Sequence, residues 1–298
     1  MSISVEPRTA MCRQAIAATP FVAAGEGAAF GLDLPGGRRV PLRLHVADGW
    51  ACLTVEVGGQ LVRTGPWDAL GLNASADGVA RLILRPGDTT VALRADVPLA
   101  VDEDPKPLLA AACDDLRRLA GEIERGAVDS GIDGSVTTAP RAQAAASPGG
   151  HAGVDFAALL TESGWPFVQR AANRLAVDLG LPDWFQQAFI TAGAGRRHRV
   201  RATVAVIESP TAATRDAIGI LLLTVSAIVR TVRGGRLDQD GESTLCFDAP
   251  LAEFPAATDV DAALGAVAMA CQMAGREART LIDERIARAY LAARGWVA

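Results

Sequence analysis

The chain has 298 residues and a mass of 30.9 kDa, a length that predicts about two domains. Half of the residues are apolar and 21% are charged, so the composition excludes a largely disordered chain and allows a substantial core. The formal net charge of −5 argues against a general nucleic-acid-binding protein, which is usually basic.

The first half of the chain predicts an antiparallel sheet followed by a long helix. Turn sequences rich in proline and glycine separate the first three β-rich runs, which is typical of a meander of hairpins. Apolar residues at intervals of three and four near the end of this half have the period of an α-helix. The expected elements are a helix at 9–18, strands at 29–34, 40–46 and 51–57, a short helix starting at Pro66, strands at 79–84 and 91–95, and a helix at 107–125.

The composition changes abruptly at 126–153. This segment is rich in Gly, Ala, Ser, Thr and Pro and has no apolar periodicity, so it is predicted to be a flexible linker with a reach on the order of 30 Å. The expected domains are therefore a first α+β unit at 1–125 and a second α+β unit at 154–298.

The second half predicts a similar mixture of helices and strands. Asp155 is a residue type that caps helices, and it precedes a stretch rich in alanine and leucine. The most apolar run, 217–229, is shorter than the roughly 20 residues that a membrane-spanning helix needs, so a buried helix is expected there. The expected elements are a helix at 155–179, strands at 185–191 and 200–207, a helix at 214–233, a strand at 244–247, and a long helix at 259–293.

A repeated phrase indicates an internal duplication. The pattern Leu-x-x-Asp-x-Pro-Leu-Ala occurs at 93–100 and again at 245–252, an offset of 152 residues. In both places the proline is expected to end a strand, and an acidic segment and a helix follow. The two halves are therefore predicted to be related units, with one strand fewer before the middle helix of the second.

The second half resembles the type III secretion chaperone-like superfamily. The resemblance rests on a helix, the sequence Gly-Gly-Arg-Leu-Asp-Gln-Asp-Gly-Glu at 234–242, a strand that ends in Asp-Ala-Pro-Leu at 248–251, and a long final helix. The first half looks like a second copy, through 82–88 and 95–99. The superfamily includes the CesT-type secretion chaperones and the YbjN-like proteins. It implies small acidic α+β proteins that act as homodimers and bind other proteins without hydrolysing anything.

This resemblance implies two tandem related units, each an antiparallel sheet with helices packed on one side. Because one chain carries two copies, it is expected to satisfy the dimer interface internally, as an intrachain pseudo-dimer. We therefore expect a monomer.

The sequence lacks the common catalytic and metal-binding motifs. Its three histidines, His45, His151 and His198, have no metal-ligand spacing, and no Gly-x-Ser-x-Gly, P-loop or His-Glu-x-x-His motif occurs. The five cysteines are scattered without a Cys-x-x-Cys pair, as expected for reduced thiols in the core of a cytoplasmic protein. We expect no cofactor, no metal site and no membrane segment.

The candidate binding residues lie in a short segment of the second half. An aromatic pair begins the strand expected at 185–191, and an extended peptide is predicted to add to the edge of this strand. The arginines that follow are expected to select an acidic flank of that peptide. Core packing of the aromatic residues and a solvated hairpin tip for the arginines are the structural alternatives. The predicted binding residues are Trp184, Phe185, Phe189, Arg196, Arg197 and Arg199.

These observations predict a non-enzymatic protein-binding module of the chaperone or adaptor type, whose partner is another protein or a peptide segment. One alternative is a structural subunit of a larger assembly, with the long final helix as an interface. The other alternative is an enzyme that acts on a phosphorylated substrate through the arginine cluster at 196–201, although no base or nucleophile stands at motif spacing.

Overall fold

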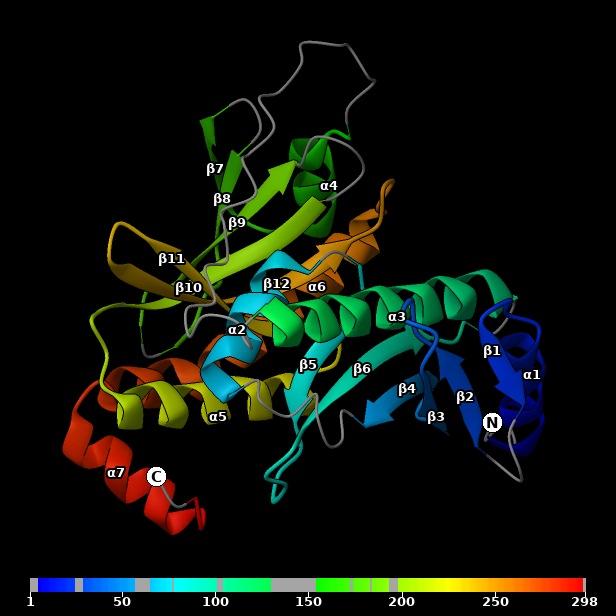
Figure 1. The fold of residues 1–298 in the computed structure, drawn as a ribbon. Coiled ribbons are helices and arrows are strands. Elements are labelled where there is room, and N and C mark those ends of the chain that lie inside the picture. Colours follow the sequence, from blue (N-terminus) through cyan, green and yellow to red (C-terminus); the bar gives the residue numbers. More distant parts are fainter. Residues whose placement is uncertain are drawn as a thin grey trace. The chain divides into compact units, whose positions relative to one another are not determined.

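The computed structural model describes residues 5–24, 29–56, 65–76, 78–100, 104–129, 154–171, 174–182, 184–192 and 198–296. Within these ranges the chain has the predicted α+β fold, with two six-stranded antiparallel sheets and helices packed against them (Figure 1). The chain forms two compact units. The first comprises Met1–Gly65 and Ala76–Gly134, and the second comprises Pro66–Ser75 and Ser135–Ala298.

The first unit is built from one sheet and the helices packed on it. Its elements are α1 (Val5–Ala17), β1 (Val22–Ala24), β2 (Phe30–Asp33), β3 (Arg39–Ala47), β4 (Trp50–Glu56), β5 (Arg81–Leu84), β6 (Val91–Pro98) and α3 (Lys106–Asp129). The strand order is β1-β2-β3-β4-β6-β5, and β2, β3 and β4 form the predicted meander. Helix α3 packs against β6, β4 and β2, and α1 packs against α3.

An apolar stripe fixes α3 on this sheet. Leu109, Leu116 and Ile123 recur at intervals of seven and are buried on one side of the helix. Full burial of one such side chain contributes about 2 kcal/mol. The helix continues to Asp129 and so includes the first four residues of the predicted linker, and 130–153 lie outside the described residues.

The second unit contains the second sheet and the other helices. Its elements are α2 (Pro66–Ser75), α4 (Phe156–Ser163), β7 (Phe167–Ala171), β8 (Arg174–Asp178), β9 (Gln187–Ala192), β10 (His198–Glu208), α5 (Ala212–Ile228), β11 (Arg233–Gln239), β12 (Glu242–Leu251), α6 (Ala257–Thr280) and α7 (Glu284–Ala293). The strand order is β11-β12-β10-β9-β8-β7. Helix α6 packs against β10 and β12, and α7 packs against α5.

The two halves of the chain share one topology. Each has a helix, four strands, a second helix, two strands and a long helix, and the strand orders of the two sheets correspond position by position. The prediction that the second half has one strand fewer before its middle helix is therefore wrong. One element departs from a division into halves: α2 is the middle helix of the first half, but it belongs to the second unit.

The helix predicted at 155–179 is wrong beyond Ser163. Asp155 caps α4 as predicted, since its carboxylate accepts a hydrogen bond from the Ala158 N–H at 3.0 Å. Gly164 then ends the helix with a φ of 77°, and Pro166 follows. Strands β7 and β8 occupy the rest of the segment. The alanines and leucines of this segment favour a helix, but Gly164 and Pro166 end the helix and allow the strands to follow.

Three further differences concern which elements are present: one predicted helix is two helices, and two strands were not predicted. The helix predicted at 259–293 is two helices, because the chain leaves the helical conformation after Thr280 and Asp283 starts a new helix by accepting hydrogen bonds from the N–H groups of Arg285 and Ile286. The sequence analysis does not predict β1, which has three residues, or β11, which contains two consecutive glycines.

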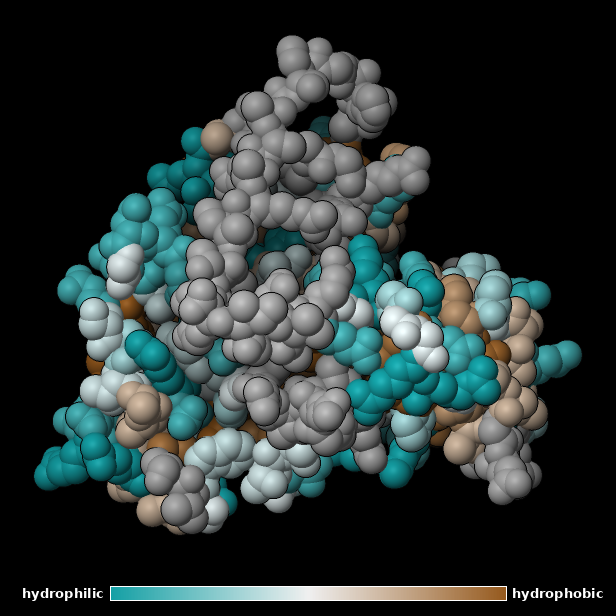
Figure 2. All heavy atoms as spheres, viewed as in Figure 1, coloured by the Kyte–Doolittle hydropathy of each residue, from teal (hydrophilic) through white to brown (hydrophobic). Residues whose placement is uncertain are grey.

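The described part of the chain contains no helix that is both long and apolar enough to cross a membrane. On the face seen in Figure 2, hydrophilic residues cover β11, whereas apolar residues gather over α1 and β1. All five cysteines are described and none forms a disulfide; four are buried and Cys52 is half-buried, which agrees with the prediction of thiols in core positions.

Candidate functional site on one face of the second sheet

Side chains from all six strands of the second sheet line up across one of its faces. Register partners in an antiparallel sheet project to the same face, so successive pairings trace a row from one edge to the other. We call this set the Asp248 row: Val168 on β7, Ala176 on β8, Phe189 on β9, Arg201 on β10, Asp248 on β12 and Arg233 on β11.

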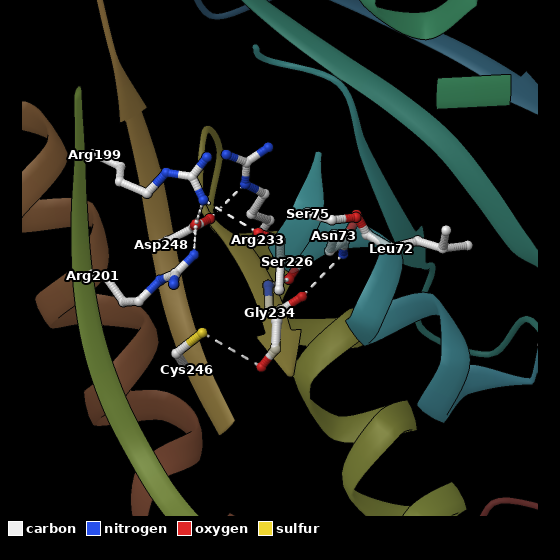
Figure 3. A network of polar contacts seen from close by, with 12 residues as sticks. Leu72, Asn73, Ser75, Arg199, Arg201, Ser226, Arg233, Gly234, Cys246 and Asp248 are labelled. Carbon is white, nitrogen blue, oxygen red and sulfur yellow. Dashed lines mark hydrogen bonds and ion pairs between the residues drawn. The ribbon is translucent and has the colours of Figure 1, made fainter. Parts of the chain in front are cut away.

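The face that carries the row lies opposite α4 and α6. The ring of Phe156 on α4 meets His198 edge-on, with centroids 4.9 Å apart, and His198 projects to the opposite side from its neighbour Arg199. Figure 3 shows Arg199, Arg201 and Asp248 pointing away from α6. We call the face that carries the row the arginine face.

Asp248 is the centre of a cluster of three arginines on this face (Figure 3). Its Oδ1 accepts a hydrogen bond from Arg233 Nε, and its Oδ2 accepts from Arg201 Nη2 at 2.9 Å and from Arg199 Nη1 at 3.4 Å. The side chains of Asp248 and Arg233 are almost fully buried, whereas those of Arg199 and Arg201 are 22% exposed. The cluster therefore joins the interior of the sheet to its surface.

The charges of this cluster keep Asp248 ionised. Burial by itself raises the pKa of a carboxyl group, but the guanidinium groups of Arg233, Arg201 and Arg199 outweigh burial, and the pKa of Asp248 is lowered. An ionised, hydrogen-bonded carboxylate holds cations in place and does not donate a proton at neutral pH. The chemistry of Asp248 is therefore that of an anchor for the arginines.

The cysteine next to the cluster, Cys246, has low reactivity. Burial raises the pKa of the Cys246 thiol to about 11, and its S–H donates to the Gly235 carbonyl at 3.6 Å. Since the thiolate is the reactive form, Cys246 is a poor nucleophile at neutral pH. It fills space between β12 and β11.

Helix α2 is bound to the edge of the sheet at β11. Asn73 Nδ2 donates to the Gly234 carbonyl at 3.0 Å, while the Gly234 N–H donates to Ser226 Oγ of α5 at 2.7 Å. Arg236 Nη1 donates to the Trp67 carbonyl at 3.1 Å, and the guanidinium lies 4.9 Å from the centroid of the buried Trp67 ring. The main-chain groups of Gly234 at this edge are therefore satisfied by α2 and α5.

Arg199 connects α2 to the arginine face. Its Nη1 donates both to Asp248 Oδ2 and to the carbonyl of Ala74, the latter at 3.2 Å, in the last turn of α2. Carbonyls at a helix C-terminus carry partial negative charge, which favours a cation there. The arginine face thus already holds the end of a polypeptide segment that is distant in sequence.

The structure brings two of the predicted binding residues to the arginine face. Phe189 is the register partner of Arg201, and Arg199 pairs with Thr191, two residues along β9 from Phe189. Arg196 and Arg197 lie outside the described residues.

The aromatic pair Trp184 and Phe185 precedes β9 and is not part of the Asp248 row. Trp184 packs on α6 close to Gly275, and the Arg279 guanidinium lies 4.3 Å from the centroid of the Trp184 ring. Trp184 therefore has a packing role, which was the structural alternative to a binding role. Phe185 is 71% exposed. The prediction that a peptide adds to the edge of strand 185–191 is wrong, because β9 is an interior strand that pairs with β8 and β10.

Sequence analysis included Arg201 only in the arginine cluster at 196–201, and it missed Arg233 and Asp248 as site residues. Asp248 stands in the repeated phrase, and Arg233 has the same offset of 152 residues from Arg81 that Asp248 has from Asp96. This repeat is the signal that could have paired them. The convergence of Arg201 on Asp248 follows from the register of β10 against β12, which residue spacing does not reveal.

The first unit has a counterpart of the cluster. The buried side chains of Arg81 and Asp96 form an ion pair, and Arg94 donates to Asp96 Oδ1 at 2.9 Å. Burial raises the pKa of Asp96, but the charges of Arg81 and Arg94 outweigh it, so the pKa is lowered. The register partner of Asp96 on β4 is Cys52. Each unit therefore contains a buried arginine–aspartate pair, and the two pairs have the same offset of 152 residues in sequence.

Among the described residues, no three His, Cys, Asp or Glu side chains gather in a way that could hold a metal ion. The comparisons with known proteins add no assignment: no protein-family model matches the chain, and no curated protein matches it in sequence.

Proposed function

We propose that the chain is a protein-binding module of the chaperone or adaptor type, and that it binds a partner polypeptide on the arginine face of the second unit. The observation that carries this proposal is the binding of α2 in the second unit. Its flanking strands, β4 and β5, belong to the first unit. The surface beside the Asp248 row thus holds a segment that reaches it from another part of the chain.

The contacts that hold α2 suit the recognition of polypeptides. Arg236 and Arg199 donate to main-chain carbonyls of α2, which every polypeptide carries, while the apolar side chains of Trp67 and Leu70 are buried. Main-chain hydrogen bonds combined with apolar anchors are a recurrent way to bind peptides. Further along the arginine face, Arg201 and Phe189 again place a guanidinium beside an apolar side chain.

The chemistry of the cluster supports binding over proton transfer. Asp248 is held ionised by arginines, and the neighbouring thiol has a pKa of about 11. The tandem α+β units and their shared topology also support the proposed resemblance to the type III secretion chaperone-like superfamily, whose members bind other proteins.

Site-specific photocrosslinking tests this proposal in the native host. A photoreactive p-benzoyl-phenylalanine replaces Val168, which is 53% exposed and belongs to the Asp248 row. The matched control carries it at Met269, which is 55% exposed on α6. We expect one protein to be crosslinked from position 168 and not from position 269. Equal crosslinking from both positions, or none from position 168, would contradict the proposal.

A further inference from the structure

Arg201 is not saturated by the contacts that the fold provides. Its Nη2 shares Asp248 Oδ2 with Arg199, and its Nε is buried without an acceptor among the described residues. A buried N–H without a partner costs free energy, so the contacts within the sheet do not use the full hydrogen-bonding capacity of this side chain. Because the side chain remains 22% exposed, a ligand can reach the guanidinium from the surface.

Comparison with the first unit shows which arginines the buried pair requires. Trp50 pairs with Pro98 in the first sheet, and Arg199 pairs with Pro250 in the second, so Arg199 stands where the first unit has a tryptophan. Both units supply a second arginine to the aspartate: Arg94 in the first and Arg201 in the second. Arg199 is therefore a third arginine that the duplicated pair does not need.

A fourth arginine, Arg174, extends the basic surface of this face beyond Asp248. Arg174 on β8 and Arg199 on β10 are both register partners of Thr191, so they lie on either side of it on the arginine face. The Arg174 guanidinium lies 4.0 Å from the centroid of the Phe189 ring. Arg174, Arg199 and Arg201 thus surround one aromatic side chain in a protein whose net charge is −5.

We infer that Arg201, with Arg199 and Arg174 beside it, binds carboxylates of an acidic segment in the partner polypeptide. The fork of N–H groups on a guanidinium matches the two oxygens of a carboxylate, and Phe189 offers an apolar contact to the carbons of a glutamate side chain. The basic patch selects acidic segments and speeds their encounter with an otherwise acidic protein. This inference rests on the proposed function, because it names the chemical class of the partner segment.

A labelled hexaglutamate peptide is the probe, with a hexaglutamine peptide as its neutral match, and fluorescence anisotropy of the full chain is the readout. We expect the acidic peptide alone to bind, more weakly as salt is added. Arg201→Gln is expected to weaken binding about tenfold or more, because it removes a charge-assisted contact. The control Arg288→Gln, on an exposed arginine of α7 paired with Glu284, leaves the affinity unchanged.

A second variant covers the case in which Arg201→Gln disturbs the buried cluster. Arg174 lies outside that cluster, so Arg174→Gln is expected to lower the affinity for hexaglutamate a few-fold and to leave the unfolding temperature unchanged. Inorganic phosphate that competes with the peptide identifies the same guanidinium site and supports the inference.

Three results overturn the inference: no binding of hexaglutamate, whether or not phosphate binds; equal binding of hexaglutamate and hexaglutamine; or affinities for hexaglutamate that neither substitution changes. If crosslinking from position 168 persists in any of these cases, the acidic partner class is wrong and the proposed function stands. If that crosslink is also absent, the proposed function fails as well.

Discussion

The two units of this protein share a topology and differ in what they display on one face of the sheet. Both keep a buried arginine–aspartate pair, Arg81 with Asp96 and Arg233 with Asp248. Next to the aspartate, however, the first unit places Cys52 and then His45, where the second places Arg201 and then Phe189. What the two units share is the pair inside the sheet, and what differs is the chemistry on the neighbouring strands.

This difference separates stability from recognition. A buried ion pair is not a strong source of stability by itself, but removing one partner leaves an uncompensated buried charge, which is strongly destabilising. Each unit of this chain contains such a pair. The neighbouring positions hold cysteine and histidine in the first unit and arginine and phenylalanine in the second.

The largest effect is expected from the buried aspartates. Asp248→Asn leaves three arginines without their carboxylate and is expected to lower the free energy of unfolding by about 4 kcal/mol. Asp96→Asn, which affects two arginines, is expected to cost less. Urea unfolding measures the free energy of unfolding of both variants. An equal or larger decrease for Asp96→Asn would contradict the expected difference between the two units.

A second substitution tests whether α2 belongs to the second unit, and it is expected to lower the free energy of unfolding by about 3 kcal/mol. Trp67→Ala removes the buried ring that anchors α2 in the second unit. Hydrogen exchange is expected to show faster exchange in β11 and α5 and unchanged protection in β3 and β4, although Trp67 lies in the first half of the sequence. Loss of protection confined to the first unit would show that α2 is assigned to the wrong unit.

A smaller effect is expected where α5 approaches the start of α2. A Cβ at Gly219 would lie 2.8 Å from the Pro66 carbonyl carbon, so Gly219→Ala forces the two helices apart and is expected to cost about 2 kcal/mol. The matched control is Gly265→Ala on α6, where a Cβ meets nothing and alanine favours the helix. Thermal unfolding of both variants is the measurement, and a destabilised Gly265→Ala with a neutral Gly219→Ala would reverse the expectation.

Acid is expected to weaken the duplicated pairs. The pKa values of Asp96 and Asp248 are lowered in the folded state, so both carboxylates stabilise the protein above their unfolded pKa of about 3.8, and this stability is lost as the pH falls towards their folded pKa values. The free energy of unfolding should therefore fall below about pH 4, and less steeply in Asp248→Asn. An identical slope in the variant would mean that Asp248 does not contribute.

Much of the fold was predictable because local signals and tertiary structure agree. The glycine turns predicted the β2–β3–β4 meander, and the spacing of three and four predicted α3. The prediction failed at 155–179, where alanine and leucine suit a helix but Gly164 and Pro166 end it, and at β11, whose glycines allow α2 and α5 to approach closely. Such packing is set by a segment about 160 residues away in sequence.

The candidate site was less predictable. The repeated phrase contains Asp96 and Asp248, and the arginine-rich stretch contains Arg199, but neither pattern shows that β10 places Arg199 and Arg201 on Asp248. That convergence depends on strand register, and the register of β10 against β12 shifts between Thr203 and Ala205. A shift of one residue moves side chains to the other face of a sheet.

The most direct test of the account compares one position in the two units. His45 and Phe189 are equivalent, since His45 pairs with Cys52 and Phe189 pairs with Arg201. The affinity of hexaglutamate is measured for His45→Ala and Phe189→Ala, with the unfolding temperature of each as a check on the fold. We predict binding about tenfold weaker for Phe189→Ala and unchanged for His45→Ala. Equal affinities in the two variants would contradict the claim that the second unit alone carries the binding face.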